Sequence, residues 1–450
     1  MIPIPKSQDV TNPLNFRLIS ILFSLSKPLE KHIDKQLRIY FENNQLFYEL
    51  QSGFRPLHSC HTALINMCES WLSAINDNTF VGSVSLDFKK AFDLVDHNIL
   101  IDKLSIYLPV SPSIDIFKSY LSDRKQYVTV NGKSSSFGMI KTGVPQDSLL
   151  GPLLFLIYIN DLPLHLDENI QTNIFADDTS LHVADNNIHK INNTLQTAIE
   201  NVNEWCITNN MIIHPDKIKS IIKTPWQKQM LKPLNLSLTL NNNKIEQVSE
   251  HLVLGLKIDS NLLWREHLKM ISKRLSKNTF LLSKLRRFAS PPALKIFFDA
   301  HICSHINYSS TIWDGCSEDV KKLPNSVHRR AIKLIDNTPN LSTDEKYRKL
   351  KILPLDSQLQ FNKACIIYKI LNNKAPKYLT PLIKKASTRY GSCRLIPLLS
   401  RIDLVRNNSL ACSGPALFNK LPKTIKKSNS LKQFKTTLYT FLKKGPIENH

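Results

Sequence analysis

The sequence predicts an α+β fold in which helices pack against an antiparallel sheet. Three observations lead to this prediction. Segments with strand and helix periodicity alternate between residues 80 and 222, a helical pattern fills residues 262–375, and 42% of the 450 residues are hydrophobic. That apolar content is enough to fill real cores, and the length corresponds to about three domains.

An amphipathic helix is expected near the start, at residues 24–43. Leu29, Ile33, Leu37 and Phe41 recur every four residues, and lysines and glutamates fill the positions between them. We expect these four side chains to be buried on one face.

The first strand of the sheet is predicted at Phe80–Leu86, and it ends at Asp87. Helical character follows. Further on, a hairpin should begin at Gln126–Val130, because Asn131-Gly132 suits the positive φ angles of a type I′ turn.

The second half of the sheet carries two adjacent acids. A buried helix at 148–162 precedes two β-prone runs that flank Asp177-Asp178, so these acids should lie at a hairpin tip. A helix from residue 188 and a strand at 218–222 complete the order. This is a ferredoxin-like arrangement with helices on one face, and the acid-bearing strand ends can meet on the open face.

Beyond the sheet, another hairpin is expected from residues 236–248, and a single strand at 252–258. The helices expected after them span residues 266–288, 291–310, 319–336, 356–373, 410–420 and 429–444.

The chain is strongly basic, with a formal charge of +22 and a pI near 9.6. This favours a polyanionic partner, nucleic acid first and an anionic membrane second. Eight cysteines without any C-x-x-C spacing are typical of buried thiols in a reducing compartment. The longest apolar run is too short to span a bilayer, and the start lacks a signal-peptide core, so we expect an intracellular protein without a membrane span.

Asp87, Asp177 and Asp178 together fit a metal site. Nucleotide transfer to a 3′-hydroxyl uses two divalent ions, and hard cations need carboxylate oxygens on rigid elements. Taken alone, the Asp-Asp pair would be a solvated turn and Asp87 a helix N-cap. Asp93 and Asp96 are assigned to helix surface or caps.

Seven blocks, in this order and spacing, resemble the reverse transcriptase of a non-LTR retrotransposon, of the jockey-like type. They are Pro5-Lys6 with Asn15–Ser20, Gln51–Arg55, Leu86–Asp93, Gly143–Gln146, Phe175–Asp178, Leu254–Asp259 and Gly414–Asn419. The resemblance covers nearly the whole chain. It implies a right-hand polymerase fold with fingers, a ferredoxin-like palm and a helical thumb, followed by a basic C-terminal region. The implied divisions are 1–75 (partial fingers), 76–225 (palm with inserted fingers elements), 226–345 (primer-grip hairpin and helical thumb) and 346–450 (basic C-terminal region).

The same resemblance implies an RNA-directed DNA polymerase that uses an RNA template, a DNA primer and deoxynucleoside triphosphates. The three aspartates would hold two Mg²⁺ or Mn²⁺ ions. Lys217 would protonate the departing pyrophosphate, or is a plain surface lysine. Leu254 and Gly255 would form the primer grip. The nucleus and cytoplasm are the implied locations, and because the chain starts inside the fingers, a separate endonuclease would nick the target.

Four further residues match nucleotide-binding positions of that family. Lys6 and Arg17 would grip the triphosphate, unless they are solvated charges. Phe92 would lie under the sugar and exclude a 2′-hydroxyl, or is a core aromatic. Gln146 would pack beside the incoming nucleotide.

Asp147 departs from the family, which usually has glycine there. A carboxylate a few ångströms from a phosphate would cost roughly a few kcal/mol, unless the side chain turns outward. The alternative is therefore a catalytically impaired retrotransposon remnant that only binds nucleic acid. An RNA-directed RNA polymerase is disfavoured, because Phe92 would exclude ribonucleotides.

The last 70 residues, 381–450, hold 14 Lys or Arg but only two acids. Five aromatic residues lie among them, which are Tyr390, Phe418, Phe434, Tyr439 and Phe441. Such a surface suits single-stranded nucleic acid through phosphate contacts and base stacking, although the aromatics also have the spacing of helix core positions.

Overall fold

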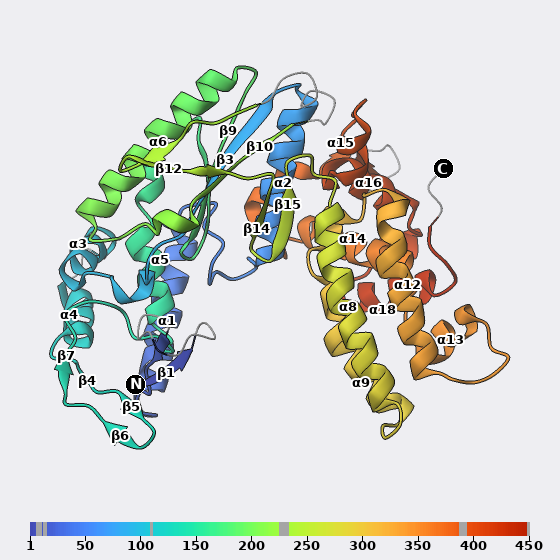
Figure 1. Cartoon of the computed structure of the whole chain (residues 1–450), viewed down its shortest axis with the longest axis horizontal. Helices are drawn as coiled ribbons and strands as arrows, with labels where there is room; N and C mark the ends of the chain where they lie inside the picture. The colour runs from blue at the N-terminus through green and yellow to red at the C-terminus, as the bar shows by residue number, and fades with distance from the viewer. Residues whose placement is uncertain (6–10, 12–15, 109–110, 225–233, 387–393, 448–450) are drawn as a thin grey trace.

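The computed structural model describes residues 1–5, 11, 16–108, 111–224, 234–386 and 394–447. Two lobes splay apart from a shared junction, one built on a sheet and one helical (Figure 1). The α+β class is confirmed. Lys6 and Tyr390 lie outside the described residues.

A five-stranded sheet, in the order β13-β10-β3-β9-β8, forms the centre of the first lobe. All neighbours in it are antiparallel except β13 with β10. The strands are β3 (Phe80–Leu86), β8 (Gln171–Phe175), β9 (Asp178–Asp185), β10 (Lys219–Lys223) and β13 (Glu246–Gln247). The predicted strands and the acid-bearing hairpin are therefore present.

One face of the sheet packs on α6 (Ile188–Thr208), which shares a core with the fully buried α5 (Gly151–Ile159). Gly82 allows this contact, because a Cβ there would lie 2.4 Å from Ile191. The opposite face is also covered, by α2 (Cys60–Asn76). The expectation of helices on one face was wrong, because α2 comes from the segment before the sheet, for which we predicted no helix.

The N-terminal elements are β1 (Ile2–Pro5) paired with β2 (Phe16–Ile19), followed by α1 (Ser26–Asn43). Helix α1 buries Leu37 and Phe41 as predicted, but Leu29 is 62% exposed. In its C-terminal half, Phe41 packs against the aromatic rings of Phe47 and Tyr107.

Between β3 and α5 the described residues form two α-helices and one long hairpin with two nested strand pairs. The helices are α3 (His97–Tyr107) and α4 (Ser111–Leu121), and the strand pairs are β4 (Lys125–Gln126) with β7 (Gly138–Met139) and β5 (Thr129–Val130) with β6 (Lys133–Ser134). Asn131 and Gly132 have φ angles of 49° and 78°, as the predicted turn requires.

The predicted single strand at 252–258 is instead a hairpin of β14 (Glu250–Val253) and β15 (Leu256–Asp259). Leu254 and Gly255 take φ angles of 45° and 79°, which reverses the chain in two residues. Before it, β11 (Thr239–Leu240) pairs with β12 (Asn243–Lys244), as expected for the 236–248 hairpin.

The second lobe is helical and matches the predicted spans closely, except that 291–310 is broken. There α9 (Pro291–Phe298), a π-helical turn (Asp299–Cys303), α10 (Ser304–Asn307) and α11 (Ser310–Trp313) follow one another. The remaining helices are α8 (Arg265–Leu285), α12 (Glu318–Ile335), α13 (Thr343–Leu350), α14 (Leu355–Leu371), α15 (Asp403–Asn408), α16 (Leu410–Lys420), α17 (Lys423–Lys426) and α18 (Leu431–Leu442), with the strand pair β16 (Lys384–Ala386) and β17 (Arg394–Ile396).

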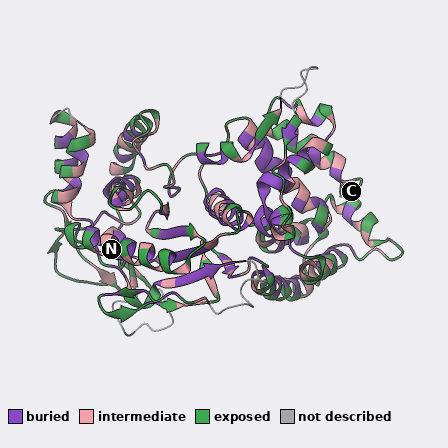
Figure 2. Ribbon diagram, turned by 90° about the horizontal axis from the view of Figure 1, so that it is seen from above, coloured by how far each residue is buried: buried purple, intermediate pink, exposed green. Residues whose placement is uncertain are grey.

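The helices on both sides of residue 345 share one hydrophobic core, and α2 contributes to it. Figure 2 shows buried residues where these helices face one another, with exposed residues outside. The proposed boundary at 345 therefore does not divide a core. The seven cysteines that the structure describes are free thiols. In the described part of the chain, no helix has the length and apolar character needed to cross a membrane.

Candidate functional site

The three predicted metal ligands meet at one end of the sheet. Strand β3 pairs with β9 so that Leu86 lies opposite Thr179, which makes Asp87 and Asp178 neighbours across the strands. Strand β8 pairs with β9 through Phe175 and Asp178, so Ala176 and Asp177 form the tip of that hairpin. Residues far apart in sequence are thus gathered by strand register alone.

The charges of these acids are only partly neutralised. Burial, Asp177 and Asp87 raise the pKa of Asp178 to about 6. The pKa of Asp177 is also raised, first by burial and then by Asp87, while Arg17 and Lys217 oppose the shift. Such mutual repulsion is the expected state of carboxylates placed to share a cation.

Among the described residues, Lys217 is the cation that forms a salt bridge with one of the three acids. Its Nζ lies 2.9 Å from Asp87 Oδ2, and its side chain is 56% exposed. The backbone N–H of His214 donates to the carbonyl of Asp87 at 2.8 Å, which fixes the strand end beside this lysine.

The donor chemistry suits a hard divalent cation, because three carboxylates with surplus negative charge converge here. Among the described residues, however, no three His, Cys, Asp or Glu side chains already surround one point as a coordination shell. Lys217 bonds to Asp87 instead. The three aspartates therefore fit hard divalent cations by their negative charge and their oxygen donors.

Gln51 holds the acid-bearing turn in place, a role that sequence reasoning did not assign. Its buried Oε1 accepts from the N–H of Gly53 at 2.8 Å and from that of Ala176 at 3.1 Å. A Cβ on Gly53 would lie only 2.3 Å from the Ala176 nitrogen, so only glycine fits. The available signal was the Gln51–Arg55 block itself.

Phe92 lies in a short 3₁₀ turn (Ala91–Asp93) that follows Asp87 in the chain. Its ring stacks on buried Phe155 with centroids 4.5 Å apart and meets Phe54 edge-on at 6.3 Å. The residue is half-buried, so one part of the ring belongs to the core.

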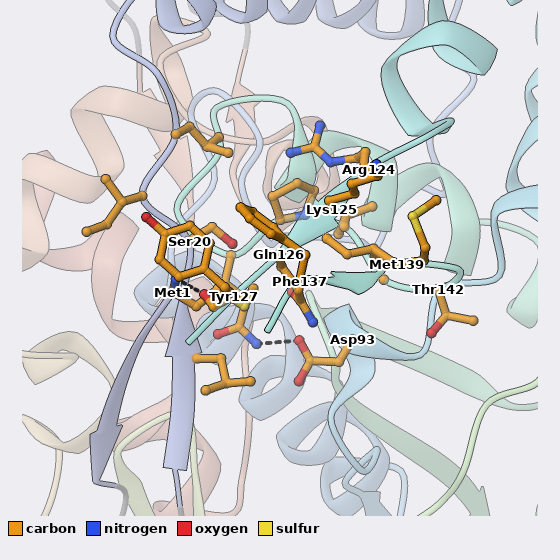
Figure 3. A pocket seen from close by; sticks show the side chains of 18 of the residues that line it. Met1, Ser20, Asp93, Arg124, Lys125, Gln126, Tyr127, Phe137, Met139 and Thr142 are labelled. Carbon is orange, nitrogen blue, oxygen red and sulfur yellow. Dashed lines mark hydrogen bonds between the residues drawn. The ribbon is translucent and has the colours of Figure 1, made fainter. Parts of the chain in front are cut away.

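Gln146 lines a separate cavity of about 1010 Å³ (Figure 3). Its side-chain Nε2 donates to Asp93 Oδ1 at 2.7 Å, and its backbone carbonyl accepts from the N–H of Ser20 at 3.1 Å. Asp93 is therefore a partner of Gln146 and no cap, whereas Asp96 is the N-cap of α3 as expected. The cationic residues that line the cavity are Lys90, Arg124, Lys125 and Lys141.

Asp147 is exposed and does not line that cavity. Its φ of 76° is a conformation that favours glycine. The glycine that the family usually has at this position would adopt this φ without strain.

The hairpin of β14 and β15 reaches the acids through a smaller cavity of about 310 Å³. Asp87, Asp178 and Lys217 line one side of it, and Leu252–Leu254 line the other. The predicted primer-grip turn therefore borders the acid-bearing sheet end.

The family model for reverse transcriptase (RNA-dependent DNA polymerase) matches residues 4–258. The chain belongs to this family. It is 30% identical over 269 residues to the probable RNA-directed DNA polymerase from transposon BS of Drosophila melanogaster, covering 58% of this chain and 29% of that protein. It is 28% identical to the RNA-directed DNA polymerase from mobile element jockey of Drosophila funebris, covering 63% and 31%. It is also 28% identical to the probable enzyme from transposon X-element, covering 72% and 36%. The chain thus spans about a third of the length of these relatives, and the jockey-like assignment is confirmed.

Among solved structures, this member of the reverse transcriptase family resembles apo telomerase from Candida tropicalis with a TM-score of 0.42 and 11% identity, covering 71% of this chain and 50% of that one.

The fold of the chain brings most, but not all, of the predicted site residues to one region. Arg17 is close enough to Asp177 to act on its pKa, and Lys217 contacts Asp87. Gln146 belongs to the other cavity.

In the C-terminal region, the four aromatic residues named above that the structure describes pack in or against the helical core. Phe418 and Phe434 are 3% and 0% exposed, and Phe434 stacks on Tyr368. Tyr439 and Phe441 are half-buried against the same core.

Proposed function

We propose that this chain is an RNA-directed DNA polymerase that extends the 3′-hydroxyl of a DNA primer with deoxynucleoside triphosphates on an RNA template. The observation that carries the proposal is the register of β3 with β9, which makes Asp87 and Asp178 neighbours beside Asp177. Carboxylates on two rigid strands suit the divalent-ion chemistry of nucleotidyl transfer.

Asp87, Asp177 and Asp178 would hold two Mg²⁺ or Mn²⁺ ions. When bound, such ions lower the pKa of the attacking hydroxyl and neutralise the triphosphate. Lys217 would deliver a proton to the departing pyrophosphate, since its ammonium group already lies at the acids. Arg17 would bind the triphosphate from the opposite side, helped by Lys6.

Phe92 would exclude a 2′-hydroxyl, and Gln146 would pack beside the incoming nucleotide. The cationic cavity next to Gln146 would receive the RNA template, because its lysines and arginine can contact phosphates. Leu254 and Gly255 would hold the primer end. A separate endonuclease would provide the nicked target, and the protein would work in the nucleus and cytoplasm.

Primer extension on an RNA template, with magnesium or manganese, tests the proposal. The wild-type chain should extend the primer, and Asp177→Asn should abolish extension while RNA binding persists. Extension that survives Asp177→Asn would contradict the assignment of the metal site.

A second function has one observation in its favour. Asp147 has a φ of 76°, which strains a non-glycine residue in the loop that carries Gln146 and would weaken nucleotide binding. The chain would then be a remnant that only binds nucleic acid. Extension that appears only after Asp147→Gly would support this alternative and locate its defect.

A further inference from the structure

Tyr308 lies where three distant segments of the chain meet. It caps α10 at the start of the sharp turn that leads into α11, where Ser309 has a φ of 49°. Its side chain points away from this helical lobe to the hairpin of β14 and β15. The proposed function assigns no role to it.

The tyrosine fixes the turn of that hairpin in two ways. Its hydroxyl donates to the carbonyl oxygen of Leu254. Its ring also lies against Gly255, where a Cβ would be 3.4 Å from both the ring edge and the hydroxyl oxygen. Leu254 and Gly255 both have positive φ, so the two residues that reverse the chain are the two that Tyr308 contacts.

The tyrosine also lies beside the start of α2. Cys60, the first residue of that helix, is close enough to Tyr308 for each side chain to raise or lower the pKa of the other. Cys60 is near enough to Asp178 to interact with its charge. At the next residue of α2, His61 Nε2 lies 2.6 Å from Thr311 Oγ1, and this hydrogen bond joins the same two segments.

From this geometry we infer that Tyr308 is a positioning residue for polymerisation: it sets the place of the Leu254-Gly255 turn relative to Asp178. The inference rests on the proposed function of that turn as the primer grip. Turn and acid line one cavity, so a shift of the turn moves the primer terminus relative to the acids. Tyr308 itself is not among the residues that line this cavity. Small misplacements of reacting groups cost rate far more than affinity.

The test compares Tyr308→Phe with Tyr347→Phe in the full chain. Tyr308→Phe keeps the ring against Gly255 and removes only the hydroxyl that donates to Leu254. Tyr347→Phe is the matched control, because it removes a buried hydroxyl that bonds His328 at 2.7 Å inside the helical lobe. Primer extension gives kcat per active site and KM for each substrate, and thermal unfolding reports stability.

We expect Tyr308→Phe to lower kcat by roughly three- to tenfold, with KM for the deoxynucleotide unchanged within about twofold. The control should keep kcat even if its melting temperature falls. Equal kcat in wild type and Tyr308→Phe, or the same loss in both variants, would overturn the inference.

A second measurement does not depend on catalysis. A 2-aminopurine at the primer 3′ end, bound to the full chain in EDTA, becomes brighter when the terminal base is less stacked. Tyr308→Phe should change this signal at saturation, whereas Tyr347→Phe should not. If the wild-type chain extends no primer, the proposed function fails. The fluorescence then decides the positioning role separately, and an identical signal in all three proteins would refute it.

Discussion

At the scale of single residues, the acid-bearing end of the sheet combines carboxylates, one lysine and a half-buried ring. Lys217 neutralises Asp87 directly, whereas Asp178 keeps a raised pKa of about 6 next to its neighbours. This imbalance is what makes the site receptive to added positive charge. At Phe92 and Asp147, we expect single substitutions to alter substrate choice and activity.

Phe92→Ala should raise the incorporation of ribonucleotides, because it removes the ring proposed to meet a 2′-hydroxyl. The measurement is the ratio of deoxy- to ribonucleotide incorporation at equal active-enzyme concentration. The ring also stacks on Phe155, so some stability will be lost, about 2 kcal/mol. Phe155→Leu serves as control, since it disturbs the same packing and should leave the ratio unchanged. An unchanged ratio in Phe92→Ala would contradict the proposal that Phe92 excludes a 2′-hydroxyl.

Asp147→Gly should increase both stability and activity. Glycine adopts the φ of 76° without strain, which is worth about 1 kcal/mol in urea unfolding, and the loop that carries Gln146 is relieved of that strain. Asp123→Gly is matched, because Asp123 is also exposed, has a φ of 52° and, like Asp147, lines no part of the cavity, but it is not next to Gln146 in the chain. We expect it to gain stability alone. Equal activity gains in both variants would rule out a nucleotide-specific effect of Asp147.

At the scale of elements, α2 connects the sheet to the helical lobe. Its Glu69 is buried, and the carboxylate accepts from Ser409 Oγ at 2.8 Å, from the N–H of Leu410 and from that of Ala411 at 3.3 Å. These groups belong to the N-terminal turn of α16, so a glutamate from one end of the chain caps a helix near the other. The Gln51 loop similarly fixes the acid-bearing turn.

Glu69→Ala should cost about 2–4 kcal/mol, because it leaves buried backbone donors of α16 unsatisfied. Urea unfolding monitored by tryptophan fluorescence measures the loss. Glu49→Ala, at an exposed position before the Gln51 loop, should stay within about 0.5 kcal/mol of wild type. A similar small change in Glu69→Ala would show that the cap adds nothing to stability.

At the scale of the whole molecule, the basic C-terminal region is part of a common core. Phe434, Leu438 and Leu442 of α18 are fully buried in it. Deletion of residues 381–450 would therefore remove core side chains along with charges, and it cannot isolate RNA binding.

Exposed lysines offer a cleaner test of RNA binding. Lys423, Lys427, Lys432 and Lys435 all face solvent. If they contact phosphates, changing all four to glutamine should reduce the slope of log affinity against log salt by up to about 3. A variant with two of the changes should show about half of that effect. An unchanged slope would show that these lysines do not contact the phosphates of RNA. Phe418 and Phe434 are buried, so bases cannot stack on them.

Buried histidines should make the fold sensitive to mild acid. Burial lowers the pKa of His61, His267 and His328 to about 4, from an ordinary value of 6.5. Below pH 6.5 the unfolded chain binds protons that the folded chain refuses, so stability present above pH 6.5 is lost as the pH falls towards 4. Each histidine contributes about 1 kcal/mol per pH unit. Urea unfolding at pH 7.5 and 5.5 should differ by several kcal/mol, and His328→Phe should reduce the difference. A difference that His328→Phe leaves intact would exclude this residue as a cause.

Local pattern predicted much of this reverse transcriptase. Strand alternation at 80–86, the Asn131-Gly132 turn and the helix at 148–162 depend on neighbours within a few residues, which a sequence displays directly. The secondary-structure prediction failed where neighbouring residues all have the same local propensity. The run from 252 to 258 has strand propensity throughout, and only the positive φ angles at Leu254 and Gly255 split it into a hairpin.

By itself, therefore, the sequence determined the family to which the chain belongs, and it predicted Asp87, Asp177 and Asp178 as the metal ligands. Only the tertiary structure decided what surrounds them. The roles of Gln51, Glu69 and Tyr308 arise from contacts across more than 50 residues of chain, with Ala176, α16 and Leu254. Such pairings depend on how whole elements pack, and packing energy is summed over many side chains that no short stretch of sequence contains.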